Sequence, residues 1–181
     1  MKYLFPPHNV YIRGVYMDRA DRDRRPVKLR AEWILRLLYA PDASGRKKRP
    51  IFGKTRLMKA TFLLHRKMGD HFPEVDTGFD FRPDKYGPLD PEVYAAINYL
   101  QSQDFIIVDA PDEHSDRYDC VKYSLTAEGV REAKELYQDL PREQRALVNW
   151  IKREHIMKEL GELLTFVYNQ YPEMTTKSEL V

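Results

Sequence analysis

Residues 121–129, VKYSLTAEG, change from the pattern of a strand to that of a helix within a few positions. Tyr123 and Leu125 alternate with polar residues, which places both on one face of a strand. Thr126 ends this strand and is a good N-cap for the helix that follows. Gly129 comes three residues later, where a side chain would crowd the sheet. The stretch therefore predicts a strand that leads directly into a capped helix packed against it.

A second strand is expected shortly before the first. Phe105–Val108 is a β-branched run, FIIV, and residues 110–116 form a polar turn. The strand that ends at Leu125 then begins at about Arg117. Two such runs separated by a polar segment predict a β-hairpin with a long tip.

Helical patterns surround this hairpin. Pro26 opens the first of them, and in the third Asp90 is a good N-cap, followed by Pro91 at the first helical position. The predicted helices span Val27–Tyr39, Lys54–Met68, Leu89–Phe105, residues 127–137, Pro141–Glu154 and Met157–Tyr171. Phe79–Arg82 alternates between aromatic and charged residues and predicts a short extended piece.

Three helices, a β-hairpin and a further helix follow each other in the order of a winged helix-turn-helix. We therefore predict a mainly α fold with a small β-hairpin wing, of the α+β class. Residues 27–138 form the winged-helix core, and residues 139–181 a C-terminal helical extension that packs on it. Residues 1–26 form an N-terminal arm or short strand followed by a charged linker.

The chain resembles known families at several places. Tyr123–Gly129 resembles the Y-x-L-T-x-x-G step of MarR- and PadR-like regulators. A longer resemblance, to the YwgA-type proteins of bacteria and archaea, covers roughly residues 28–180. It is carried by Gly53–Leu64, Phe79–Phe81, Lys85–Pro88, Pro91–Tyr94 and Leu163–Ser178. The Y-G-P and P-E-V-Y pair is also similar to the Panacea antitoxin domain. These resemblances imply a winged-helix-like protein with a regulatory or antitoxin-like role and bring no catalytic residue.

The charge of the chain is unevenly distributed along it. The net charge of +2 divides into +10 for residues 1–56, −7 for residues 57–116 and −1 for residues 117–181. Such asymmetry is typical of a protein with one surface for a polyanion. The alternative is that the basic and acidic segments neutralise each other in the fold.

The densest positive charge marks the candidate nucleic-acid contacts. Four consecutive cations stand in a loop rich in proline and glycine, and three more polar residues open the next helix, where free N–H groups favour a phosphate. The predicted contacts are Arg46, Lys47, Lys48, Arg49, Lys54, Thr55, Arg56 and Lys59, with Arg22, Arg24 and Arg25 in the arm. The alternative is a solvated, flexible loop.

The third helix is a poor candidate for reading DNA. It begins with Asp90 and Glu92, which we expect to face the phosphates, and it carries no Lys or Arg through Gln103. Asn98, Gln101 and Gln103 are able to bond adenine edges. The tip of the wing, residues 112–116, is acidic as well. We therefore expect any nucleic-acid contact to come from the arm, the loop and the second helix.

A protein partner is the second candidate ligand. Lys85-Tyr86-Gly87-Pro88 forms a rigid turn before a capped helix and is the predicted partner site. The alternative is that Tyr86 packs under the start of that helix. Leu147 and Trp150, with the apolar stripe of the last helix, are predicted to cover the first helix and to extend into a homodimer interface.

Several chemical functions are disfavoured. Gly53-Lys54-Thr55 lacks the glycine that a phosphate-binding loop needs five positions earlier, where Lys48 stands. The five histidines show no ligand spacing, His65 is expected in the core, and the single cysteine, Cys120, has no catalytic framework. No cofactor, metal, membrane segment or secretion signal is expected. We predict a cytoplasmic, non-enzymatic regulator that binds DNA or RNA, with an adaptor or antitoxin-like protein as the alternative and a hydrolase well behind both.

Overall fold

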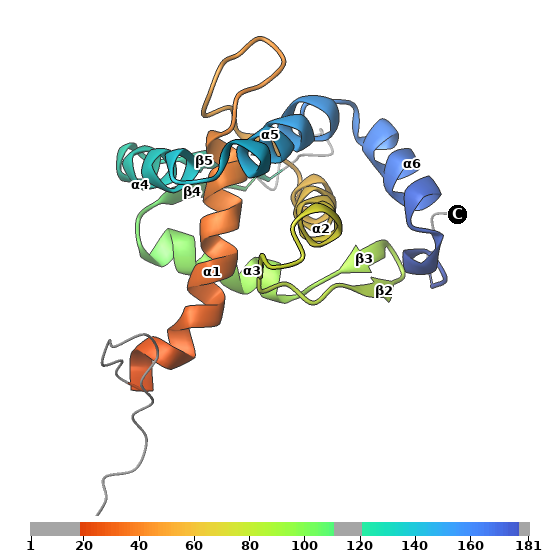
Figure 1. Cartoon of the computed structure of the whole chain (residues 1–181), viewed down its shortest axis with the longest axis horizontal. Helices are drawn as coiled ribbons and strands as arrows, with labels where there is room; N and C mark the ends of the chain where they lie inside the picture. The colour runs from red at the N-terminus through yellow and green to blue at the C-terminus, as the bar shows by residue number, and fades with distance from the viewer. Residues whose placement is uncertain (1–18, 111–120, 178–181) are drawn as a thin grey trace, which may run out of the picture.

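The computed structural model describes residues 19–110 and 121–177 of the 181-residue chain (Figure 1). In these ranges the protein is mainly helical with small antiparallel sheets, which confirms the predicted α+β class. The helices are α1 (Arg19–Tyr39), α2 (Lys54–His71), α3 (Glu92–Ser102), α4 (Ala127–Gln138), α5 (Arg142–Ile151) and α6 (Leu160–Gln170). A π-helical turn, η1 (Lys152–Ile156), continues α5, and a 3-10 turn, η2 (Pro172–Met174), follows α6.

The predicted hairpin is present as β4 (Ile106–Asp109) and β5 (Lys122–Leu125), which pair antiparallel with Val108 opposite Tyr123. Its predicted tip, residues 110–116, lies almost wholly outside the described residues. A further strand, β1 (Ile51–Phe52), pairs with β5 and completes a sheet of order β1-β5-β4. Sequence periodicity did not predict β1, because two residues are too short to show alternation.

A second, smaller hairpin joins α2 to α3. Its strands are β2 (Arg82–Asp84) and β3 (Gly87–Leu89), with Arg82 opposite Leu89. The predicted extended piece at residues 79–82 ends where β2 begins, and Phe79 and Phe81 are buried beside it. The predicted Lys85–Pro88 turn is therefore the tip of a hairpin.

The first helix begins earlier than predicted. Pro26 lies inside α1 rather than at its start, and residues 19–25, predicted as a charged linker or an exposed helix start, already form its first turns. A proline within a helix costs one backbone hydrogen bond. The helix continues through this position, so the prediction that Pro26 starts it was wrong.

Helix α1 passes through the middle of the molecule (Figure 1). It packs against α3 on one side and against α4 and α5 on others. Its stripe of Ile34, Leu35 and Leu38 is buried, as its spacing predicts. Helix α5 contacts both α1 and α2, whereas α6 packs mainly on α2. The C-terminal helices thus cover the second helix as well as the first.

The third helix is shorter than predicted, because Leu89 belongs to β3. The N-cap position is taken by Pro91, one residue after the predicted Asp90. Asp90 still binds the start of the helix, since its Oδ1 accepts the Glu92 N–H at 2.9 Å. Its Oδ2 accepts the Asp80 N–H at 2.8 Å, which fixes the segment before the small hairpin.

None of the helices within residues 19–110 and 121–177 combines the length and the apolar character needed to cross a bilayer.

The step from strand to helix that begins α4 is confirmed in detail. The Thr126 side chain accepts the Gly129 N–H at 2.9 Å and donates to the Asp104 carbonyl at 2.6 Å. A Cβ at Gly129 would lie 1.8 Å from the Phe105 carbonyl oxygen. Glycine is therefore required here because helix and strand touch through their backbones.

Substitution of this glycine tests the contact. We expect Gly129→Ala to lower the free energy of unfolding by about 3 kcal/mol or more, because the methyl group would collide with backbone that cannot turn aside. Gly161→Ala is the matched control: no atom lies within 4 Å of its Cβ position in α6. It should raise stability by about 0.5 kcal/mol through helix propensity. Urea denaturation measures both, and equal stabilities would contradict the backbone contact.

Candidate functional site

The segment from residue 42 to residue 49, called here the basic loop, is held in shape by hydrogen bonds. The Asp42 carboxylate is 4% exposed and accepts the Ser44 N–H at 2.9 Å, the Ser44 hydroxyl at 2.6 Å and the Arg46 N–H at 2.9 Å. The hydrogen bond from the Ser44 side chain is the main reason that the pKa of Asp42 is lowered. The first half of the loop is therefore folded around an anion of its own.

Lys152, on the first turn of η1, holds the other end of the loop. Its fully buried ammonium donates to the carbonyls of Leu37 at 3.0 Å, Leu38 at 3.2 Å and Arg49 at 2.7 Å. Two of these carbonyls belong to the last turn of α1, where a cation is favoured by the helix dipole. Burial lowers the pKa of Lys152 to about 7. The loop is thus bonded to the core, which argues against the alternative of a free flexible loop.

The four cations of the basic loop differ in their surroundings. Arg46 and Arg49 approach the Asp42 carboxylate, with nitrogen-to-oxygen distances of 3.4 and 3.8 Å. Lys47 is exposed and places its ammonium 5.4 Å from the centre of the Tyr39 ring. Lys48 is exposed and takes a left-handed backbone, with φ of 64°. Lys47 and Lys48 are therefore the least neutralised of the four.

The start of α2 continues this positive surface only in part. Lys54 is exposed at the first position of the helix, next to Thr55. Arg56 is half-buried, and its guanidinium donates to the carbonyls of Phe52 and Lys158, both at 3.0 Å. Arg56 thus ties α2 to its neighbours, and Lys54 is the residue here whose charge faces solvent.

Lys59, predicted as a nucleic-acid contact, is buried and does not belong to the exposed basic surface. Its side chain is 3% exposed, and its Nζ donates to the carbonyls of Tyr86 at 2.5 Å and Pro88 at 2.9 Å. Burial lowers its pKa to about 8, and Asp84 opposes that shift. Lys59 lies inward because the hairpin tip covers the face of α2 from which it projects.

The predicted partner site, Lys85–Pro88, is exposed only in its first half. Tyr86 is 47% exposed, so it does not pack under the start of α3. Gly87 and Pro88 are buried, contrary to their prediction as contact residues. A Cβ at Gly87, where φ is +80°, would lie 2.7 Å from a ring carbon of Tyr168. Gly87 and Pro88 therefore position Tyr86 and are not themselves presented to a partner.

A small pocket of about 100 Å³ opens beside this tip and is called here the tyrosine pocket. Its lining includes Thr55 and Lys59 of α2, Asp84 and Tyr86 of the hairpin, and Tyr94 of α3. Tyr94 is 37% exposed. Burial, followed by the neighbouring Tyr94, raises the pKa of Tyr123 to about 12.

Helix α3 offers little to a phosphate backbone. Glu92 pairs with Arg30 of α1 at 3.0 Å. Asp90 is 2% exposed and satisfied by backbone N–H groups, so the expectation that it faces phosphates was wrong. Asn98 and Gln101 are exposed, as reading of a base edge would need.

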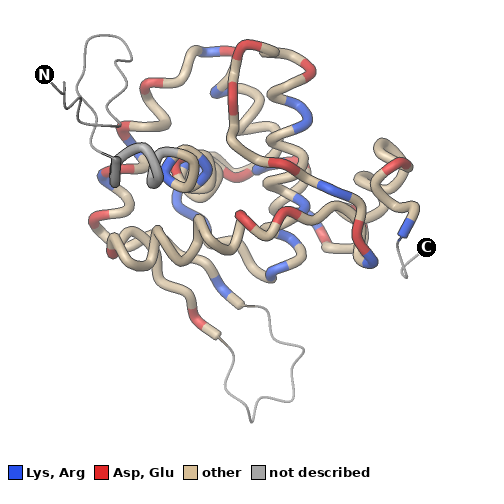
Figure 2. The backbone as a smooth tube through the Cα atoms, turned by 90° about the horizontal axis from the view of Figure 1, so that it is seen from below, with Lys and Arg blue, Asp and Glu red and all other residues tan. Residues whose placement is uncertain are grey.

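Charges of both signs are interspersed over the described elements (Figure 2). The pairs Arg30–Glu92 and Arg66–Glu173 join elements far apart in sequence. The Arg30 pair joins the basic first segment to the acidic second one, so the two neutralise each other in part. The side chains of Arg22, Arg24 and Arg25, and the whole of residues 112–116, lie outside the described residues.

Metal and cofactor chemistry has little support in residues 19–110 and 121–177. No three His, Cys, Asp or Glu side chains gather there in a way that would hold a metal. His65 is half-buried, and its Nδ1 lies 2.7 Å from the Thr77 hydroxyl, as expected of a histidine with a structural partner. Cys120 lies outside the described residues.

Neither Lys152 nor Tyr94 was predicted from the sequence to have a functional role. A signal for Lys152 was present, because Val148, Ile151, Lys152 and His155 follow the spacing of a buried helical stripe. A lysine in such a stripe indicates a buried cation with backbone partners. Tyr94 carried no such signal, since an aromatic residue beside an apolar stripe is ordinary.

Models of known protein families give no match to this chain, and neither do curated proteins. The resemblance to YwgA-type proteins and to the Panacea domain therefore stays a prediction.

The pH dependence of stability tests the position of Lys152. An exposed lysine has a pKa of 10.5, against about 7 for Lys152. Between these values the unfolded chain holds a proton that the folded chain releases, so the free energy of unfolding should rise with pH. We expect Lys152→Met to remove this rise, which amounts to up to about 1.4 kcal/mol per pH unit.

Urea denaturation between about pH 7 and 9.5, below tyrosine ionisation, measures the effect. Lys59 adds a rise of the same sign above about pH 8 in both proteins, so their difference isolates Lys152. Parallel curves for the two proteins would show that Lys152 is not buried as described.

Proposed function

We propose that this protein is a non-enzymatic, winged-helix regulator of the cytoplasm that binds nucleic acid through the basic loop and the start of α2. The usual recognition helix, α3, contributes little to the phosphate contacts in this proposal. The observation that carries it is the cationic loop itself, which is exposed at Arg46, Lys47 and Lys48 and bonded to the core at both ends.

The order of elements supports the winged-helix part of the proposal. With the small hairpin set aside, the chain runs α1-β1-α2-α3-β4-β5, and β1 closes the sheet on β5. Three helices covered by a three-stranded sheet whose last two strands form a hairpin are the parts of a winged helix-turn-helix. The β2–β3 hairpin is then an insertion where a simple helix-turn-helix has a short turn.

The place of the basic loop supports the choice of contact surface. The loop extends beyond the helices at one end of α1 (Figure 1). Lysines that protrude from the body of a protein reach phosphates without close approach of the acidic groups elsewhere. Because Asp42 and Lys152 fix the loop backbone, little conformational entropy is lost on binding.

A protein-binding function is the second candidate. Two partly exposed aromatic residues, Tyr86 and Tyr94, line the same pocket, and exposed aromatics are enriched in protein interfaces. A homodimer through the C-terminal helices stays a separate prediction. Leu147, Trp150 and Leu160 in these helices are partly buried against the core, which limits the apolar area left for a second copy.

Neutralisation of the loop tests the main proposal. We expect the double variant Lys47→Gln/Lys48→Gln to bind duplex and single-stranded oligonucleotides more weakly than the natural chain. The slope of log affinity against log salt should fall by roughly 1 to 2, because each lost phosphate contact removes about 0.7 to 0.9 from it. Fluorescence anisotropy between about 50 and 200 mM salt measures the slope.

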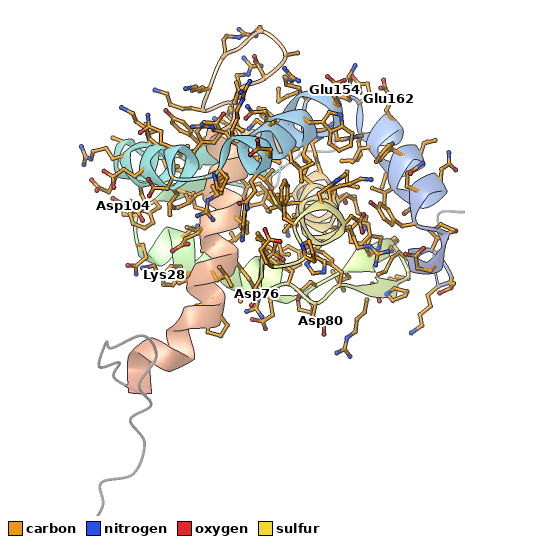
Figure 3. All side chains as sticks on the ribbon, viewed as in Figure 1. Lys28, Asp76, Asp80, Asp104, Glu154 and Glu162 are labelled. Atoms are coloured by element: carbon orange, nitrogen blue, oxygen red, sulfur yellow. The ribbon has the colours of Figure 1, made fainter. Side chains whose placement is uncertain are left out.

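The matched control is Lys28→Gln/Lys177→Gln, which removes the same charge from two other exposed lysines. Lys28 lies toward the opposite end of α1 from the basic loop (Figure 3). This control should keep the natural slope. Equal losses in the two double variants, or a natural chain that binds no nucleic acid, would refute the proposal.

A further inference from the structure

The tyrosine pocket combines features of a site for one planar polar group. We propose that it receives a single unstacked base of a single-stranded nucleic acid, held between Tyr86 and Tyr94. This inference rests on the proposed nucleic-acid function and names the form of nucleic acid that is bound. It assigns the tip of the β2–β3 hairpin, together with Tyr94 in the first turn of α3, as the base-contacting surface.

The walls of the pocket provide the stacking surfaces. Tyr86 is 47% exposed and Tyr94 is 37% exposed, and both residues belong to its lining. Exposed aromatic rings stack on bases of any sequence and are the usual platforms for single strands. The pocket volume of about 100 Å³ suits one small planar group.

The floor of the pocket provides a donor and an acceptor. Two of the three N–H groups of the Lys59 ammonium bond to backbone carbonyls, and the third has no acceptor among the described residues. The Asp84 carboxylate lines the same pocket and attracts that ammonium. A base edge carries carbonyl or ring-nitrogen acceptors beside amino or imino donors, so it complements this pair.

The backbone of the hairpin tip is hydrogen-bonded to α2 and α6. The Tyr86 carbonyl accepts from Lys59 at 2.5 Å and from the Tyr168 hydroxyl at 3.3 Å, which fixes the residue that carries the exposed ring. Gly87 allows α6 to approach the tip closely. Burial of a lysine to hold an exposed tyrosine is costly for stability alone, and it is explained if the position of that ring matters.

The pocket also lies next to the proposed phosphate contacts. Thr55, in the first turn of α2, belongs to its lining, and the exposed Lys54 precedes it in sequence. A strand with one base in the pocket can therefore place a neighbouring phosphate at the start of α2, where free N–H groups favour an anion. The donor and acceptor on the floor suit a base better than an apolar side chain of a protein partner.

Binding of labelled oligonucleotides tests the inference. The probes are single strands of dT and of dC of about 12 nucleotides, within the usual site size of such proteins, and a duplex of equal length. We expect Tyr86→Ala and Tyr94→Ala each to weaken single-strand binding roughly 10-fold, with little effect on the duplex. The salt slope should stay unchanged, because no phosphate contact is lost. Asp84→Asn should alter the ratio of dC to dT affinity, since it changes the acceptor that faces the base edge.

Three controls accompany these binding measurements. Ile107→Ala removes another exposed apolar side chain, 50% exposed on the outer face of the sheet, and should leave all affinities unchanged. Free dCMP and dTMP at equal concentration should not compete with the strand, whereas effective competition would make the pocket a nucleotide site instead. Circular dichroism of each variant confirms the fold.

The measurements distinguish a pocket that binds no base from a protein that binds no nucleic acid. If the tyrosine variants bind single strands as the natural chain does, while the loop variant is weakened, the base pocket is refuted and the basic-loop function stands. If the natural chain binds no nucleic acid, both proposals fall together.

Discussion

The bonds of the Lys152 ammonium hold together three parts of the molecule that are far apart in sequence. Its acceptors close the last turn of α1 and fix Arg49 at the end of the basic loop, while its own backbone starts the π-helical turn after α5. Three carbonyls match the three donors of an ammonium. An apolar residue at this place would leave buried carbonyls without partners, which is why the position requires a long donor.

Lys59 has a similar structural role to that of Lys152. It too is a buried lysine that bonds to main-chain carbonyls, and it too fixes a connection that presents side chains to solvent. The two proposed contact surfaces, the basic loop and the tyrosine pocket, therefore each depend on a cation that never reaches the surface. The positive charge of the chain serves internal architecture as well as any external polyanion.

The elements with a clear period or cap were predictable from sequence. The helices, the β4–β5 hairpin and the contact at Gly129 follow from apolar spacing, an N-cap threonine and a glycine beside a sheet. Short elements were not: β1 has two residues, and β2 and β3 have three each, too few for alternation to show.

For the candidate site, the sequence predicted which basic residues cluster along the chain but not which of them are exposed. Sequence places Lys47, Lys54 and Lys59 in one basic region, but it does not show that Lys59 turns inward beneath a hairpin. The pairing of Asp42 with the loop arises locally and lies within reach of sequence reasoning, since Asp-x-Ser is a common turn. The bonds of Lys152 arise over more than a hundred residues, a separation that no local pattern reveals.

That separation has a consequence for the order in which the protein takes shape. The bond from Lys152 to Leu37 spans 115 positions of the chain. During synthesis from the N-terminus, α1 and the basic loop emerge long before the residue that closes them. Contacts of such range are slow to form because the intervening chain must first be ordered. The nascent protein therefore exposes its most cationic segment, held only by the local bonds of Asp42, until Lys152 has been made.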